Sequence, residues 1–345
     1  MVFWTVWQKN VGLEVPEFDL IDKYLKPLAT DQAALGLLDD AAVINASQGH
    51  SLVLSKDMMV EGVHYDAHTP VNLLAKKLLR VNLSDLAAMG AKPRGYLLGL
   101  SLPKKFSKEQ SEQWLSSFCD GLRQDQELFG VSLLGGDTVS VQDGVVLSLT
   151  MVGEVLLGQV IKRTGAKAGD VILVTGSLGD AALALNLNTH KWQLEDKEKQ
   201  YLFERLNLPQ PRLEVGLLLR GLVNSAIDVS DGLLADLEHI TKASGVGADV
   251  YLHKLPLSSA ARECCASEAN LMENFWPLIY AGGDDYELVF TVAKHNLAEV
   301  KAVLEKIDVA VSEIGIVKEG DGVNLLDAEN NKITLAKKGY EHFAS

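Results

Sequence analysis

The sequence predicts a mixed α/β protein built from two domains, and three observations support this prediction. The chain has 345 residues, and about 150 residues per domain favours two domains. Strand-like and helix-like segments mix in both halves without strict alternation, which is typical of α/β or α+β domains. Glycine and lysine cluster in residues 158–170, where one apolar pattern ends and another begins, so the domain boundary is expected there.

The first domain is expected to contain helices separated by short strands. Apolar residues recur at helical spacing in its helix-like segments, and Ser107 is the expected cap of the last of these helices. Short segments rich in Val, Ile and Leu predict strands. The predicted helices are 16–29, 70–89 and 107–130, and the predicted strands are 41–46, 50–60, 94–103, 131–136 and 144–155.

The second domain is expected to begin with a buried strand at 171–175, which the turn GSLGD joins to a helix. A polar region rich in Lys and Glu follows near residues 190–205. Residues 230–245 then predict an amphipathic helix. A late strand and helix complete this half of the chain.

Charge and composition limit the classes of partner. Acidic side chains outnumber basic ones by 46 to 32, which gives a formal charge of −14 and a pI near 5.0. Such a chain repels nucleic acid and anionic membranes, so neither is expected as a partner. It can still bind a nucleotide if divalent cations lie between its carboxylates and the phosphates.

The sequence indicates a cytoplasmic protein. Three cysteines occur, without the paired spacing of a zinc site. No apolar run approaches the roughly 18 residues of a membrane span, and the N-terminus lacks the pattern of a signal peptide. P-loop, H-E-x-x-H, G-x-S-x-G and H-R-D motifs are also absent from the sequence, which excludes the enzyme classes built on them.

Several aspartates interrupt apolar or Gly-rich segments, where an unpartnered buried carboxylate would cost several kcal/mol. Magnesium is the natural partner for such a set, because it prefers hard oxygen ligands and can exchange its waters for phosphate oxygens. Each aspartate also has a structural interpretation, as a helix cap or a turn residue. The residues are Asp39, Asp40, Asp57, Asp85, Asp137, Asp228, Asp231, Asp284 and Asp285.

Other candidate residues also leave two interpretations open. The turn GSLGD either presents backbone N–H groups to an anion or is simply a tight turn between strand and helix. Arg163 lies in the Gly-rich segment and either faces a phosphate or is exposed to solvent. His64 lies in an apolar context and either contacts a substrate or has a structural role.

These motifs, in this order, resemble the thiamine-monophosphate kinase family. Its superfamily also contains aminoimidazole ribonucleotide synthetase, selenophosphate synthetase and a hydrogenase maturation protein. The resemblance runs from residue 16 to residue 343, and its most specific segments are DMMVEGVHY, VNLSDLAAMGAKP, GGDT, KRTGAKAGD, AIDVSDGLLADLEHI and GGDDYEL. It implies a two-domain PurM-like fold, with an N-terminal domain at 16–157 that binds ATP and metal and an α/β domain at 158–343. It also implies a homodimer in which the N-terminal sheets pair.

The resemblance implies ATP-dependent phosphorylation of thiamine monophosphate to thiamine diphosphate, with release of ADP. The transfer would be direct and in line, in a site with several magnesium ions, and would be the last step of thiamine diphosphate biosynthesis. Whether potassium takes part as well stays open. The implied metal ligands are Asp40, Ser55, Lys56, Asp57, Asp85, Asp137, Asp228 and Asp231, of which Asp57, Asp85, Asp137 and Asp228 form the catalytic set. The implied ATP contacts are Gly136, Asp137, Arg163 and Ser230, and the implied substrate contacts are His64, Asp284 and Lys337.

Three positions depart from the pattern of this family. Lys56 stands where the family often has Thr, which is tolerable if the backbone carbonyl binds the metal. Asp284 stands where Glu is usual, so its carboxylate reaches one methylene less far. Lys337 stands where an aromatic side chain can stack on the substrate.

Two other functions are weighed against this one. The chain could be another ATP-using member of the superfamily, although a selenophosphate synthetase typically needs a reactive cysteine near its N-terminus and no cysteine precedes Cys119. It could also be a non-catalytic nucleotide-binding regulator. The intact set of carboxylates argues against the regulator, because an inactive relative has no physical need to hold them together.

Overall fold

The structure is a computed structural model that describes residues 17–190, 192–335 and 339–340. The chain divides into two compact units, which are described separately below. Of the described residues, unit 1 contains 17–47, 54–82 and 93–153, and unit 2 contains 48–53, 83–92 and the residues from 154 onwards. The mixed α/β architecture of these units agrees with the predicted fold class.

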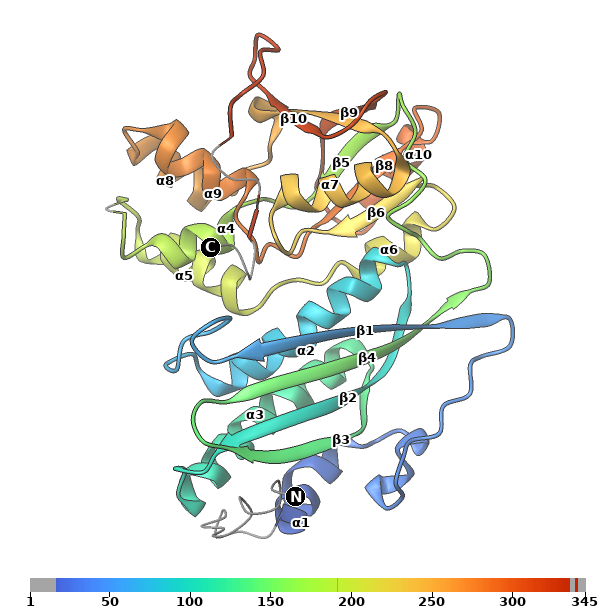
Figure 1. Ribbon diagram of the computed structural model, residues 1–345, viewed down its shortest axis with the longest axis vertical. Coiled ribbons are helices and arrows are strands. Elements are labelled where there is room, and N and C mark those ends of the chain that lie inside the picture. Colours follow the sequence, from blue (N-terminus) through green and yellow to red (C-terminus); the bar gives the residue numbers. More distant parts are fainter. Residues whose placement is uncertain (1–16, 191, 336–338, 341–345) are drawn as a thin grey trace, which may run out of the picture. The chain divides into compact units, whose positions relative to one another are not determined.

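Unit 1 is built on a four-stranded sheet with the order β1-β4-β2-β3. Figure 1 shows the helices α2, Val71–Ala88, and α3, Lys108–Phe129, lying on one side of this sheet. Strands β2 and β3 are parallel. The strands are β1 His50–Val60, β2 Lys92–Pro103, β3 Ser132–Val141 and β4 Val146–Leu156.

The two faces of this sheet differ in burial. On β4, Leu147, Leu149 and Met151 are fully buried on the side of the helices. On β1, Leu54 is 64% exposed and Met58 is 51% exposed, and in unit 1 no described helix covers the face that Figure 1 turns to the viewer. The uncovered face therefore carries apolar side chains that unit 1 alone does not bury.

The helix predicted at 16–29 is confirmed as a helical run from Glu17 to Leu28 that changes its hydrogen-bond type along its length. It consists of α1 Glu17–Leu20, the π-helical turn η1 Ile21–Leu25 and the 3-10 turn η2 Lys26–Leu28. A further 3-10 segment, η3, follows at Gln32–Leu37.

The strand predicted at 41–46 is wrong, because this segment is irregular. The N–H of Val43 donates to the carbonyl oxygen of Ala33 in the preceding local segment, at 2.9 Å, rather than to a neighbouring strand. A strand needs a partner of this kind, and a short apolar run does not specify one.

Helix α3 begins where the sequence predicts. Ser107 and Gln110 form a reciprocal capping box, in which each side chain accepts from the other residue's backbone N–H. Gly130 ends the helix in the left-handed region, with φ 65°, a conformation that costs a glycine little.

Unit 2 contains a six-stranded sheet with the order β10-β7-β9-β5-β8-β6. The pair β10–β7 is parallel, and the other neighbouring pairs are antiparallel. Its strands are β5 Val171–Thr175, β6 Ser225–Asp228, β7 Gly247–Tyr251, β8 Leu288–Val292, β9 Val311–Lys318 and β10 Val323–Leu326. Its helices are α4 Asp180–Asn186, α5 Asp196–Asn207, α6 Leu213–Leu219, α7 Leu233–Ser244, α8 Ser259–Ser267, α9 Trp276–Tyr280 and α10 Leu297–Glu305, with shorter turns η4 Leu252–Lys254 and η5 Leu271–Phe275.

Both faces of the second sheet are buried. Ile172 of β5 packs in one core with Leu237 of α7, and Leu173 packs in another core with Leu219 of α6 and Leu304 of α10. Successive residues of a strand point to opposite faces. Strand β5 therefore contributes apolar side chains to both cores, and its sequence is a continuous apolar run.

Among the described residues, no helix has the length and apolar character needed to cross a membrane.

Candidate active site

Strand β1 places three predicted metal ligands in succession, but on two faces of the sheet. The Ser55 hydroxyl donates to the carbonyl oxygen of Asn82 in α2, at 3.4 Å, so Ser55 lies on the helix-covered face. Side chains alternate along a strand, and Asp57 therefore shares the face of Ser55. Lys56 lies on the opposite face, where its ammonium group donates to the Ser148 hydroxyl of β4.

Strand β3 carries the first Gly-Gly-Asp segment. Asp137 is exposed and pairs in register with Gly99 of β2. An added Cβ at Gly99 would lie 3.2 Å from the Cβ of Ser148, so Gly99 lies on the face where Lys56 contacts Ser148. The register therefore places Asp137 on the face of Lys56 and not on the face of Asp57.

The other predicted residues of unit 1 lie in connecting segments. Asp40 is exposed in the irregular segment before β1. His64 lies in the turn after β1, where its Nδ1 accepts the backbone N–H of Val60 at 3.1 Å. A neutral imidazole whose Nδ1 accepts in this way carries its proton on Nε2. This hydrogen bond supports the structural interpretation of His64.

In unit 2, β6 ends at Asp228, whose carboxylate is buried. The Ser84 hydroxyl donates to Asp228 Oδ2 at 2.7 Å. Burial, followed by the nearby Asp85 carboxylate, raises the pKa of Asp228 to about 7, and Arg163 acts in the opposite direction. Two carboxylates at one place disfavour each other's charge, which is the electrostatic condition that a bound cation relieves.

The loop after β6 brings three more predicted residues together. Ser230 and Asp231 follow Asp228 by two and three residues. The N–H of Asp284 donates to the carbonyl oxygen of Ser230 at 2.9 Å. Asp284 itself has φ 68°, a conformation that is uncommon for a residue with a side chain, and its Oδ1 accepts the Tyr286 hydroxyl at 3.1 Å.

Asp236 was missed by sequence reasoning, although it also interrupts an apolar run. It is 2% exposed on α7, and its Oδ2 accepts three successive backbone N–H groups, from residues 230–232. Burial, with the carboxylates of Asp228 and Asp231, raises the pKa of Asp236 to about 8. The position of Asp231 before α7 is also that of a helix cap, but the carboxylate that accepts the N–H groups at the start of α7 is that of Asp236.

Asp285 and Glu287, in and just after the second Gly-Gly-Asp segment, are buried carboxylates with partners elsewhere in unit 2. Both Asp285 oxygens accept the N–H of Gly179, at 3.0 and 2.8 Å. The turn GSLGD thus directs this N–H to the protein's own carboxylate, which favours the interpretation as a strand-to-helix turn. Glu287 is 1% exposed and binds Arg212 at 2.6 and 2.7 Å and Arg205 at 2.9 Å.

The two remaining predicted residues differ in what the structure says of them. Arg163 is exposed, and its carbonyl oxygen accepts the Ser244 hydroxyl at 3.3 Å. Its charge acts on Asp228, so it lies within electrostatic reach of that carboxylate. Lys337 lies outside the described residues.

The described residues contain no group of three or more His, Cys, Asp or Glu side chains close enough together to hold a metal. In unit 2 the charge of Asp85 does act on Asp228, and Ser230 and Asp231 follow Asp228 in the chain. Carboxylate and hydroxyl oxygens are the donors that magnesium prefers, so the chemistry of this donor set fits the implied ion.

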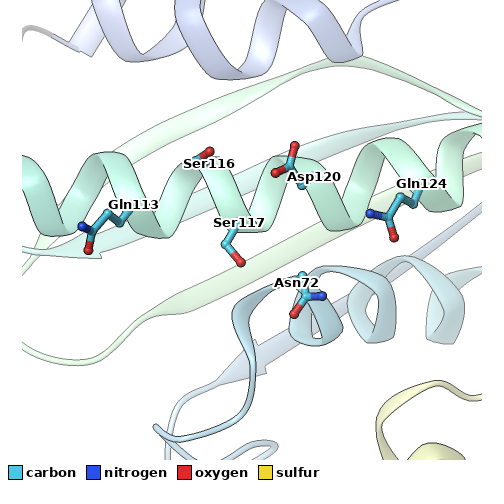
Figure 2. Close-up of a pocket in the computed structure, with 6 residues that line it drawn as sticks. All are labelled: Asn72, Gln113, Ser116, Ser117, Asp120 and Gln124. Carbon is cyan, nitrogen blue, oxygen red and sulfur yellow. The ribbon is translucent and has the colours of Figure 1, made fainter.

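Unit 1 also has a cavity of about 510 Å³ that none of the predicted site residues lines. Figure 2 shows Asn72 of α2 opposite Ser117 of α3, with further polar side chains along α3. The lining residues are Asn72, Gln113, Ser116, Ser117, Asp120 and Gln124. It contains one acidic side chain and no basic one, so it does not resemble a phosphate site.

Comparisons with known proteins agree with the family that the motifs indicate. The model of the AIR synthase related protein N-terminal domain matches residues 38–155, and that of the corresponding C-terminal domain matches residues 167–327. A thiamine-monophosphate kinase of Caulobacter vibrioides is 40% identical over 327 residues, which cover 94% of this chain and 90% of that protein.

Two solved structures share the fold over nearly the whole chain. The thiamine-monophosphate kinase of Stenotrophomonas maltophilia has a TM-score of 0.78 at 38% identity, covering 90% of this chain and 96% of its own. A structure described as "AaThiL complexed with AMPPCP and TMP" has a TM-score of 0.74 at 29% identity, covering 95% of this chain and 97% of its own. The fold and the sequence identity together establish that the chain belongs to the thiamine-monophosphate kinase family, within the AIR synthase related proteins.

Proposed function

We propose that this protein transfers the γ-phosphoryl group of ATP to thiamine monophosphate, forming thiamine diphosphate and ADP. The observation that carries the proposal is the 40% identity to a thiamine-monophosphate kinase over 94% of this chain. The Asp228 carboxylate agrees with it, because Asp228 is buried and the charge of Asp85 acts on it. Such a site calls for cations, and cations are what an acidic chain needs to hold phosphates. The family membership supports the substrate, since a related structure is described as a complex with AMPPCP and TMP.

The chemistry requires little from a general base. The acceptor is a phosphate monoester, whose second pKa of about 6 leaves it largely ionised at pH 7. The protein must instead hold two anionic reactants in line and offset their repulsion. Magnesium, when bound, supplies this charge neutralisation.

The proposed roles follow the family pattern residue by residue. The family pattern assigns Asp57, Asp85, Asp137 and Asp228 to the ions nearest the transferred group. Within one copy, Asp137 lies on the face of the unit 1 sheet opposite Asp57, so these two carboxylates hold different ions. Asp40, Ser55, Asp231 and the carbonyl oxygen of Lys56 complete the metal set, because the Lys56 side chain lies on the other face of its sheet. Gly136, Arg163 and Ser230 bind ATP, and His64, Asp284 and Lys337 bind the thiamine phosphate.

We also propose that two copies associate through the uncovered face of the unit 1 sheet, with functional domains at 16–157 and 158–343. The exposed apolar side chains of β1 support this dimer, because a contiguous apolar surface is typical of a contact site. The enzyme is expected to work in the cytoplasm.

Two carboxylate-to-amide variants test the metal-dependent mechanism. Asp57→Asn and Asp137→Asn each keep the shape of the side chain but lose its charge, so turnover is expected to fall by about 100-fold or more while the melting temperature stays near that of the wild type. The matched control is Asp143→Asn, an exposed carboxylate that pairs with Lys105 at the surface, at 3.1 Å. Near-normal turnover in both active-site variants would count against the mechanism.

The substrate is tested by an end-point assay with ATP and magnesium. Thiamine monophosphate, free thiamine and an aminoimidazole precursor serve as parallel acceptors, with and without potassium, and chromatography separates the products. Thiamine diphosphate plus ADP, dependent on magnesium, supports donor, acceptor and reaction together. ATP binding without transfer to any acceptor would favour the non-catalytic regulator instead.

A further inference from the structure

The loop between β6 and α7, residues 229–232, precedes a helix and so resembles a place where backbone N–H groups bind an anion. Its hydrogen bonds show a different use of these groups. The N–H groups of Ser230, Asp231 and Gly232 donate to Asp236 Oδ2 at 3.0, 3.0 and 3.2 Å. A carboxylate of the protein already occupies the position that a phosphate oxygen would take.

The carbonyl oxygens of the same loop are also hydrogen-bonded within the chain. Residues 229–232 accept, in order, from the N–H groups of Tyr286, Asp284, Tyr340 and Asp236, at 2.8, 2.9, 2.9 and 3.0 Å. The N–H of Val229 donates to the carbonyl oxygen of Glu287 at 2.8 Å. Every backbone donor and acceptor of the loop therefore has a partner.

The loop can meet a ligand only through side chains, and these are oxygen donors. Asp228 lies just before it, and Ser230 and Asp231 lie within it. A carboxylate and hydroxyl set with no available N–H group suits a cation and disfavours a bare phosphate.

We propose that Asp236 is a positioning residue that makes this loop a magnesium-binding surface instead of an anion-binding one. Asp236 directs three N–H groups inward and fixes the backbone from which Ser230 and Asp231 project. Phosphates are then bound at this loop through metal, apart from the contact that the Ser230 hydroxyl makes with ATP in the proposed function. The inference rests on the proposed function for its use of magnesium, and does not depend on the identity of the phosphate acceptor.

The alternative is that Asp236 only stabilises the first turn of α7. Gly232 is the N-cap residue and offers no side-chain hydrogen bond, so a carboxylate that reaches back to it has capping value. A capping role alone predicts lower stability with an unchanged magnesium requirement. A positioning role predicts a changed magnesium requirement.

Two substitutions separate these interpretations. Asp236 is ionised above its raised pKa of about 8, so the variants are compared at about pH 8.5. At that pH Asp236→Asn keeps one acceptor oxygen without charge, and hydrogen bonds to a neutral acceptor are about half as strong as charge-assisted ones. Asp236→Ala removes the acceptor and leaves three N–H groups unpaired around the space of the lost carboxylate, which an anion can fill only if this space opens to solvent. Glu238→Gln is the matched control, since Glu238 lies on the same helix and forms a surface pair with Lys242 at 3.6 Å.

The experiment measures the melting temperature of the full chain, without nucleotide, during titration with magnesium chloride and separately with inorganic phosphate. For Asp236→Asn we expect the magnesium concentration at half-maximal stabilisation to rise by about 10-fold. The magnesium dependence of turnover should shift in parallel, while the KM for thiamine monophosphate changes less than about twofold. For Asp236→Ala we expect the stabilisation by magnesium to be lost and stabilisation by phosphate without metal to appear. Glu238→Gln should behave like the wild type.

Unchanged magnesium midpoints in Asp236→Asn, with only a lower melting temperature, would overturn the proposal and leave a helix cap. So would a wild type that magnesium does not stabilise. If Asp236→Ala does not fold, Asp236→Asn decides the question. If the wild type binds magnesium but phosphorylates no acceptor, the proposed function is wrong. The titrations still test the role of Asp236 in that case.

Discussion

At the scale of single residues, Gly136 has less space for a side chain than its neighbour Gly135 in the same segment of β3. An added Cβ at Gly136 would overlap the carbonyl oxygen of Leu98 in β2, whereas one at Gly135 would lie 3.4 Å from the side chain of Leu97. Gly136→Ala is therefore expected to lower the free energy of unfolding by about 1–3 kcal/mol, because the clash is with backbone and forces a strand to move.

Gly135→Ala supplies the control for this prediction, and its cost should stay within about 0.5 kcal/mol. Thermal unfolding of the two variants beside the wild type measures the difference. Equal melting temperatures for Gly135→Ala and Gly136→Ala would show that β3 can shift without cost.

The residue scale also explains one departure from the family pattern. Lys56 stands among predicted metal ligands, and a cation there would repel magnesium if its side chain joined them. The structure places the Lys56 ammonium group on the other face of the sheet, against Ser148. Only the backbone of Lys56 is then available to an ion held by Ser55 and Asp57.

At the scale of elements, a buried ion pair joins the two helices of unit 1. Arg80 of α2 donates through Nε and Nη2 to both carboxylate oxygens of Asp125 in α3, at 2.6 and 3.0 Å. The side chains are 7% and 1% exposed. Arg80→Met leaves the Asp125 charge buried without this partner and should destabilise the protein by about 3–5 kcal/mol.

The double variant Arg80→Met with Asp125→Leu removes both charges and should recover most of that loss. Urea unfolding of both single variants, the double variant and the wild type completes the cycle. A double variant as unstable as Arg80→Met would mean that packing around the pair, and not the unpaired charge, sets the cost.

The sequence predicts elements well where the signal is local. The Ser107 cap lies at the start of α3, because a capping box is contained within four residues. The sequence of residues 41–46 alone cannot show whether they form a strand, because strand formation depends on a neighbouring strand elsewhere in the chain. At the site, the spacing of Asp228, Ser230 and Asp231 is visible in the sequence. The role of Asp236 is not visible in the sequence, because it depends on the direction in which its carboxylate projects from the helix.

At the scale of the whole molecule, the uncovered face of the first sheet predicts association between copies. Replacing Leu54 by Lys places a charge in this apolar surface, and burying an unpaired charge is costly. Leu54→Lys is therefore expected to shift the protein from dimer to monomer, as measured by sedimentation velocity. A wild-type chain that sediments as a monomer would contradict the prediction.

Leu128 of α3 is a closely matched control, because it is a leucine with the same 64% exposure in the same unit. It lies on a helix and not on the uncovered face. The Leu128→Lys variant should have the same sedimentation coefficient as the wild type. An equal effect of both substitutions would show that the uncovered face of the sheet is not the contact surface.

The alternation along β1 also constrains how the gene can change. One strand supplies Ser55 and Asp57 to the helix-covered face and Leu54, Lys56 and Met58 to the other. Adding or removing a single codon within this strand would exchange the two sets downstream of the change. Length differences among natural relatives are therefore expected to accumulate in the irregular segment 38–49, while β1 changes by substitution alone.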